Sequence, residues 1–127
     1  MHPNVETLKR FYAAHAKGDV AGMLAECGEN VTFQIAGKSK LAGKYDRASF
    51  GKLIETMKSL GGGTLEADIH DITATDLHGM VLMTNTVTRD GKKHEYRCVH
   101  VWRIQGGKPI AWYEYPRDLY QYDAIWS

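Results

Sequence analysis

Residues 96–115, YRCVHVWRIQGGKPIAWYEY, are the stretch from which the rest of the chain is best interpreted. Polar and apolar residues alternate on both sides of Gly106-Gly107, which predicts two long strands joined by a tight turn. In one of the two strand phases considered below, the inward face of these strands carries His100, Trp102, Trp112 and Glu114. A few polar groups among large aromatic side chains are typical of a pocket, so the upstream chain is expected to cover this face.

Length and composition predict one globular domain with little net charge. The chain has 127 residues and a formal net charge of +1, which suits a single hydrophobic core and disfavours a nucleic-acid partner. No apolar run approaches the roughly 18 residues of a membrane span, and no secretory leader is recognised. Cys27 and Cys98 lie far apart, which predicts reduced thiols and a cytoplasmic location. We therefore expect one domain over residues 1–127, without a nucleic-acid or membrane partner.

The first half of the chain predicts three helices. Asn4 is expected to cap the first helix, which Gly18 ends and whose core-facing stripe is Leu8, Phe11, Tyr12 and His15. Asp19 is expected to cap a short second helix, and Asp46 a third one, which the glycines at 61–63 end. These helices supply apolar stripes that a sheet can cover.

Most of the remaining segments predict strands, and a last short helix is expected over about residues 118–125, after Pro116. Residues 30–36, NVTFQIA, alternate and predict a first strand, which a surface loop over residues 37–44 follows. After the triple glycine, four more strands are expected over residues 64–75, 80–89, 92–105 and 108–115. Turn residues separate these four strands at 78–79, 90–91 and 106–107. The apolar phase slips near His70-Asp71, which indicates a β-bulge. Helices followed by a run of strands predict an α+β fold.

The Asp90-Gly91 dipeptide predicts a two-residue hairpin turn and therefore sets the register of the strands on either side. Pairing Arg89 with Lys92 places on one face Val81, Met83, Asn85, Val87, His94, Tyr96, Cys98, His100 and Trp102. The opposite face carries threonines and charged residues near the turn. The face with His100 is therefore predicted to be the drier one.

The turn at residues 106–107 leaves two registers open. A three-residue loop that includes Lys108 places His100 opposite Glu114, so that both side chains point inward. A two-residue loop places His100 opposite Tyr113 and turns Glu114 outward. The sequence pattern does not choose between them, and the orientation of Glu114 stays open at this point.

Three segments together are similar to a known family: AAHAKGDVAGMLAECGENVTF at 13–33, the helix between GKYDRASF and GGG at 43–63, and VHVWRIQGGKPIAWYEYPRD with the later YDAIW at 99–126. The chain resembles the SnoaL-like and ketosteroid-isomerase-like branch of the nuclear transport factor 2-like superfamily. This resemblance implies a cone-like, cystatin-type fold in which a curved sheet wraps around N-terminal helices and encloses an apolar pocket, usually in a homodimer. Members include isomerases, dehydratases, epoxide hydrolases, polyketide cyclases and binding proteins, so the fold alone does not decide the function.

Residue matches within the resemblance favour one branch over the others. Steroid isomerases have a tyrosine on the first helix where this chain has Phe11, with Tyr12 one step further on. Their general-base aspartate matches Gln34, which cannot exchange protons, so that mechanism is not expected. An arginine with two aspartates, as in epoxide hydrolases, is not found on the inward face. SnoaL-like cyclases carry a histidine and an acid, commonly aspartate, at the positions of His100 and Glu114, and this match favours the three-residue loop.

The His100–Glu114 pair is the candidate catalytic pair. Burial raises the pKa of a carboxylate and a nearby imidazolium lowers it, so such a pair can move a proton from a carbon next to a carbonyl near neutral pH. An enolate oxygen would be held by Asn85, Gln34 or Tyr12. The alternative is that His100 only satisfies a neighbour in a packed core and Glu114 faces solvent.

The other candidate residues are expected to bind the ligand. They are Tyr12, His15, Gln34, Met83, Asn85, Tyr96, Cys98, Trp102 and Trp112. Cys98 is interpreted as a small apolar filler and His15 as a residue of the core or of the pocket rim. No metal site or cofactor is expected, because the histidines lack ligand spacing and no phosphate-binding glycine loop occurs.

The leading hypothesis is an enzyme that binds a small hydrophobic carbonyl compound and transfers a proton on it, as an isomerase or a polyketide-cyclase-like enzyme. The alternatives are a non-catalytic ligand-binding or protein-interaction domain and, third, a dehydratase that uses His100 with a pocket tyrosine. A homodimer is expected through the outer sheet face, where apolar area would otherwise be exposed on Val99, Val101, Tyr113 and Tyr115.

Overall fold

The protein is described here by a computed structural model, which covers residues 2–127. Over these residues the chain forms four helices and six strands, in the order α1 (Pro3–Ala16), α2 (Val20–Ala25), β1 (Thr32–Ile35), β2 (Gly43–Asp46), α3 (Phe50–Gly61), β3 (Glu66–Ala74), β4 (His78–Arg89), β5 (Lys92–Gln105), β6 (Lys108–Pro116) and α4 (Leu119–Ile125). The described helices include none with the length and apolar character needed to cross a membrane.

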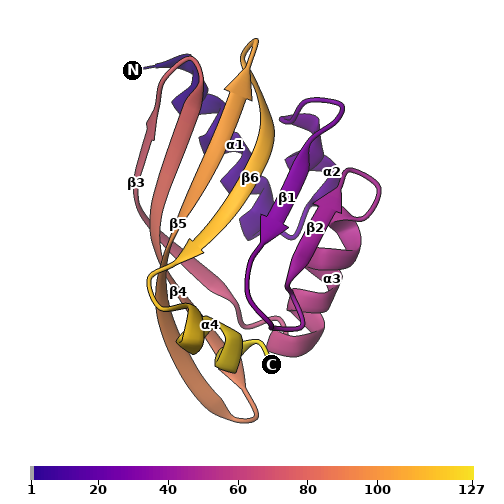
Figure 1. Cartoon of the computed structure of the whole chain (residues 1–127), viewed down its shortest axis with the longest axis vertical. Coiled ribbons are helices and arrows are strands. Elements are labelled where there is room, and N and C mark those ends of the chain that lie inside the picture. Colours follow the sequence, from indigo (N-terminus) through magenta and orange to yellow (C-terminus); the bar gives the residue numbers. More distant parts are fainter. Residues whose placement is uncertain (1) are drawn as a thin grey trace.

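The strands form one curved, open sheet in the order β2-β1-β6-β5-β4-β3. Neighbouring strands are antiparallel except for β1 and β6, which run parallel. Figure 1 shows α1 behind the sheet, α3 beside β1 and β2, and α4 at the end of β6. The helices and the inner face of the sheet share one apolar core. The predicted α+β fold, with a curved sheet around N-terminal helices, is therefore confirmed.

The hairpin between β4 and β5 has the predicted register. Arg89 pairs with Lys92, and the turn residues Asp90 and Gly91 have φ angles of 52° and 75°. A turn with two positive φ angles matches the right-handed twist of the strands, which explains why Asp-Gly specifies it. The alternate residues of β4 and β5 that were assigned to the drier face are mostly buried, including His100.

The hairpin between β5 and β6 combines features of both predicted registers. Its loop has two residues, because Gln105 pairs with Lys108. The register then shifts by one residue on β6, where Ile110 has no partner on β5, and beyond this bulge His100 pairs with Glu114. An extra residue in one strand moves every later side chain of that strand to the opposite face. The bulge therefore turns Glu114 inward although the loop is short.

The predicted bulge near His70 is also present, since the β3–β4 register shifts between Ile69 and Asp71. Two predicted helix starts were wrong. His2 caps α1, with its Nδ1 accepting a hydrogen bond from the backbone N–H of Asn4 at 3.0 Å. Ser49 precedes α3, and Asp46 lies three residues earlier, where its carboxylate accepts from the Ser49 backbone. In both cases the expected capping residue lies a few positions from the true one.

Two predicted connections were also wrong. Residues 43–46 were assigned to a loop and its flank, but they form the edge strand β2, which pairs only with β1. A short edge strand with glycine and lysine has little of the composition that predicts strands. The turn assigned to His78-Gly79 lies instead at residues 75–77, because the Thr75 hydroxyl accepts hydrogen bonds from the next residues and closes the turn there.

Candidate functional site

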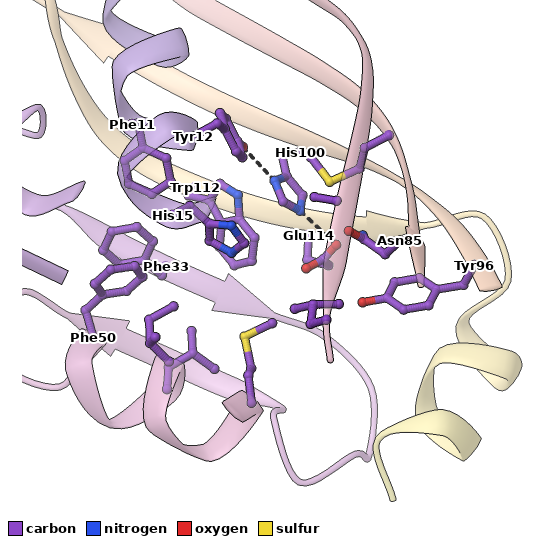
Figure 2. A pocket seen from close by; sticks show the side chains of 16 residues that line it. Phe11, Tyr12, His15, Phe33, Phe50, Asn85, Tyr96, His100, Trp112 and Glu114 are labelled. Carbon is purple, nitrogen blue, oxygen red and sulfur yellow. Dashed lines mark hydrogen bonds and ion pairs between the residues drawn. The ribbon is translucent and has the colours of Figure 1, made fainter. Parts of the chain in front are cut away.

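A cavity lies between the inner face of the sheet and helices α1 and α3 (Figure 2). Its apolar walls include Phe33, Phe50, Ile54, Met57 and Trp112, and its polar groups gather around His100 and Glu114. The cavity volume is about 40 Å³. A water needs roughly 10–15 Å³ of such space, whereas ligand sites usually enclose about 300–1,000 Å³. The cavity therefore has room for a few water molecules, and a larger ligand requires its walls to move apart.

The side chains at the polar end form one hydrogen-bonded chain. The indole N–H of Trp102 donates to Tyr12 Oη at 3.0 Å, and Tyr12 Oη lies 2.6 Å from His100 Nδ1. On the other side of the ring, His100 Nε2 lies 3.0 Å from Glu114 Oε1. An ionised carboxylate only accepts hydrogen bonds, so Nε2 carries a proton and, in the neutral ring, Tyr12 donates to Nδ1. These contacts fix the tautomer of the neutral His100 ring, whereas in the imidazolium form both ring nitrogens carry protons and Nδ1 donates to Tyr12 Oη.

The environment sets the ionisation state of each end of this chain. Burial opposes ionisation of Glu114, but the charge of His100 and hydrogen bonds from His100 and Cys98 outweigh it and hold the pKa of Glu114 below its ordinary value. Burial raises the pKa of Tyr12 well above its ordinary value. Near neutral pH, Glu114 is therefore an anionic proton acceptor and Tyr12 a neutral hydrogen-bond donor.

Cys98 lies beside this pair. Its Sγ accepts a hydrogen bond from Asn85 Nδ2 at 3.1 Å and lies 3.8 Å from His100 Nε2. Burial, followed by the charge of Glu114, raises the pKa of the Cys98 thiol far above its ordinary value. The donor atoms of Cys98, His100 and Glu114 lie within 4.8 Å of one another, a spacing that one metal ion could bridge. A metal ion would bind the thiolate form of Cys98, and both burial and the negative charge of Glu114 disfavour that form. The three side chains therefore fit a hydrogen-bonded network with a protonated thiol better than a metal site.

Eight of the residues predicted for the site line the cavity: Tyr12, His15, Met83, Asn85, Tyr96, His100, Trp112 and Glu114. Two others, Cys98 and Trp102, are buried behind the wall and hold Asn85 and Tyr12 in place. The prediction for Gln34 was wrong. Because side chains alternate along β1, Phe33 and Ile35 point inward and Gln34 faces a groove on the outer side of the sheet.

The sequence-based prediction missed the wall that α3 contributes. Ile54 and Met57 line the cavity, together with Leu65 from the connection between α3 and β3. The helical spacing of apolar residues on α3 had indicated a core-facing stripe. An apolar stripe that covers a cavity has the same pattern as one that packs against a core, so no sequence signal separates the two.

The cavity adjoins two grooves on the outside of the molecule. His15 and Leu65 line the cavity and also both grooves, whose volumes are about 280 and 580 Å³. Ile54 and Met57 line the cavity and the smaller groove. The residues shared by the cavity and these two grooves therefore come mainly from α1, α3 and the segment that follows α3.

The curved sheet and the enclosed polar pair define a cavity-bearing protein of the nuclear transport factor 2-like class. The sequence matches the SnoaL-like domain over residues 8–112, and the chain belongs to this family. This match confirms the resemblance drawn from the sequence. Among curated proteins, none matches the chain significantly.

Several solved structures share the fold over nearly the whole chain. Bal32a, from a soil-derived mobile gene cassette, is 28% identical with a TM-score of 0.90, and the match covers 98% of this chain and 97% of Bal32a. A nuclear transport factor 2-like protein from Burkholderia pseudomallei is 20% identical with a TM-score of 0.89, over 100% and 99% of the two chains. TerC, co-crystallised with polyporic acid, is 21% identical with a TM-score of 0.85, over 99% and 100%.

Proposed function

We propose that this protein binds a small, largely apolar molecule with a carbonyl group and transfers a proton on it without a cofactor, as an isomerase or a polyketide-cyclase-like enzyme. The observation that supports this proposal is the buried contact between His100 Nε2 and Glu114 Oε1, at 3.0 Å, on the wall of an apolar cavity. Two comparisons are consistent with an organic ligand: the chain belongs to the SnoaL-like family, and the structurally similar TerC was co-crystallised with polyporic acid.

Glu114 is the proton acceptor in this proposal. Its carboxylate takes a proton from the carbon next to the carbonyl, and the electron pair of the broken C–H bond moves to the carbonyl oxygen to give an enolate. The protonated carboxyl group then returns the proton to a different carbon in an isomerase. In a cyclase, the enolate carbon instead forms a C–C bond to a second carbonyl of the same molecule; the π electron pair of that carbonyl moves to its oxygen, which takes the proton from Glu114. His100 orients the carboxylate throughout, and Tyr12 holds the His100 tautomer.

A second candidate function is ligand binding without catalysis. It is favoured by the fact that both ring nitrogens of His100 already have protein partners, Tyr12 and Glu114. Buried polar groups in most proteins are satisfied in this way without any catalytic role. Binding alone requires the cavity to open, but it does not require Glu114 to accept a proton.

Proton transfer can be tested without knowing the natural substrate. The assay is the incorporation of deuterium next to the carbonyl of 2-tetralone in D₂O, followed by proton NMR. Positioned general bases contribute roughly 10²- to 10⁴-fold, so Glu114→Gln should lower the protein-dependent exchange rate by at least about 10²-fold. Glu55→Gln, on the exposed face of α3, is the matched control and should exchange at the wild-type rate.

The proposal fails if wild-type protein adds nothing to the background exchange of 2-tetralone and of other acidic ketones. It also fails if Glu114→Gln, folded to the same extent as the wild type, retains full exchange activity. Ketone binding with no exchange would support the binding-only function instead.

We also propose that the protein forms a homodimer through the outer face of the sheet. Two rows of apolar side chains cross β4, β5 and β6 on this face: Met80–Val101–Tyr113 and Leu82–Val99–Tyr115. Leu82 and Tyr115 are 43% and 55% exposed. A contiguous apolar patch on a sheet, away from the cavity, is typical of a surface that another molecule covers.

A further inference from the structure

His15 occupies a distinctive position in the site. It lies in the last turn of α1, one turn after Tyr12, and it lines the cavity and both grooves that adjoin it. Figure 2 shows its ring among the side chains that line the cavity. Of the two residues common to the cavity and both grooves, His15 and Leu65, His15 is the polar one, so its imidazole is available to a molecule that enters from either groove.

The ring of His15 has no hydrogen-bond partner among residues 2–127, unlike the other polar side chains of the cavity. Those with partners are Tyr12, Asn85, Tyr96, His100 and Glu114. A partly buried imidazole that faces a cavity gains free energy when a ligand supplies the missing hydrogen bond. The ring nitrogens of His15 are therefore free to bind a ligand, whereas the hydroxyl of Tyr12 is already engaged.

The charge of the cavity restricts what His15 can bind. The cavity lining includes neither lysine nor arginine, and Glu114 is anionic. Burial, and then the charge of His100, lowers the pKa of His15, which keeps its ring neutral near pH 7. A neutral imidazole offers one N–H donor but no compensating positive charge. The charge of His100 is already paired with Glu114, so a carboxylate or phosphate beside His15 would meet no unpaired cation in the cavity lining.

We propose that His15 binds the carbonyl oxygen of the ligand through its ring N–H, and that the ligand is an uncharged ketone or aldehyde rather than a carboxylic acid or phosphate ester. This inference rests on the proposed function for the carbonyl group and adds the residue that recognises it. When Glu114 takes the proton, the electron pair of the C–H bond moves to the oxygen that His15 contacts. The hydrogen bond from His15 then strengthens as negative charge develops on that oxygen.

A pair of probes with nearly the same shape tests this recognition. Acetophenone and benzoate differ mainly in charge, and both can be titrated into uniformly ¹⁵N-labelled protein while the imidazole resonances are recorded. Acetophenone should shift the ring nitrogen signals of His15 and bind more weakly to His15→Phe by about threefold to tenfold, the range for one hydrogen bond. His15→Gln, whose amide also donates, should recover most of the binding. His78→Phe, at an exposed histidine outside the cavity, is the matched control and should bind as the wild type does.

Benzoate should leave the His15 signals unchanged at concentrations that saturate the protein with acetophenone. The inference is overturned if benzoate binds as tightly as acetophenone, or if His15→Phe and His15→Gln bind acetophenone like the wild type. Its failure is distinguishable from failure of proton transfer. If deuterium exchange depends on Glu114 but acetophenone binding does not depend on His15, the proposed function is supported and the inference about His15 is refuted. If acetophenone binding depends on His15 but the protein catalyses no exchange, the inference is supported and proton transfer is refuted.

Discussion

Replacing Tyr12 by phenylalanine tests whether the hydrogen-bonded chain exists as described. The hydroxyl accepts from Trp102 Nε1 at 3.0 Å and contacts His100 Nδ1 at 2.6 Å, and all three side chains are buried. Removing it leaves both partners without a hydrogen bond inside the core. Each lost bond costs about 0.5–1.5 kcal/mol, and each orphaned buried group about 1–3 kcal/mol when it cannot reach water. Since the small cavity lets water replace part of the loss, we expect destabilisation by about 2–4 kcal/mol.

Tyr122 provides a matched substitution with the opposite expectation. It is as deeply buried as Tyr12, but its hydroxyl has no hydrogen-bond partner among the described residues. A buried hydroxyl without a partner costs about 1–3 kcal/mol in mutational comparisons. Tyr122→Phe removes that cost and leaves only the space of one oxygen atom, so we expect an effect between zero and about 1.5 kcal/mol of stabilisation.

The assay is urea unfolding of the two variants and of Tyr120→Phe, followed by circular dichroism. Tyr120 is 91% exposed, so its variant should stay within about 0.5 kcal/mol of the wild type. The slopes of the free energy against urea should agree among the variants, because the surface exposed on unfolding does not change. The described chain is refuted if Tyr12→Phe costs less than about 0.5 kcal/mol, or if Tyr12→Phe and Tyr122→Phe have equal effects.

Two further predictions concern pH and assembly. Burial and the charge of His100 lower the pKa of His15 from its ordinary value of 6.5, so the unfolded state binds a proton more readily than the folded state. The free energy of unfolding should therefore fall as the pH drops below 6.5. In urea titrations at about pH 5 and pH 8, His15→Gln should show a smaller difference between the two pH values than the wild type. Light scattering after gel filtration should show a dimer for the wild type and mostly monomer for Leu82→Glu, whereas Leu77→Glu, in an exposed turn, should stay dimeric. A monomeric wild type would contradict the proposed interface.

The elements that the sequence predicted well are those whose local signals agree with the fold. Asp90-Gly91 determines both the turn geometry and the register of β4 with β5, because its two positive φ angles suit Asp and Gly. The inward positions of His100 and Asn85 follow directly from that register. Edge strand β2 could not be predicted in the same way, because its pairing with β1 depends on the folded chain rather than on its own composition.

The residues of the candidate site were predictable only where a local sequence pattern indicates the direction of the side chain. Tyr12, His15 and His100 lie on elements whose phase the sequence indicates, and all three line the cavity. Gln34 was assigned through the family match, although the alternation of β1 around the apolar Phe33 indicates an outward side chain. The size of the cavity follows from how α3 packs against the sheet, and periodicity carries no information about such a distance.

The orientation of Glu114 depends on a feature that no local pattern reveals. A two-residue loop without a bulge would place Tyr113 opposite His100 and turn the carboxylate to the outer face. The extra residue at Ile110 reverses this outcome, and the loop after α2 supports the bulge. The N–H of Gly28 donates to the carbonyl oxygen of Pro109 at 2.8 Å, and a Cβ at Gly28 would approach the Ile110 side chain to 3.2 Å. A glycine far from the cavity thus lets the loop after α2 pack closely against the bulge that brings the acid to the histidine, so the candidate chemistry depends on packing between this loop and β6 as well as on the pair itself.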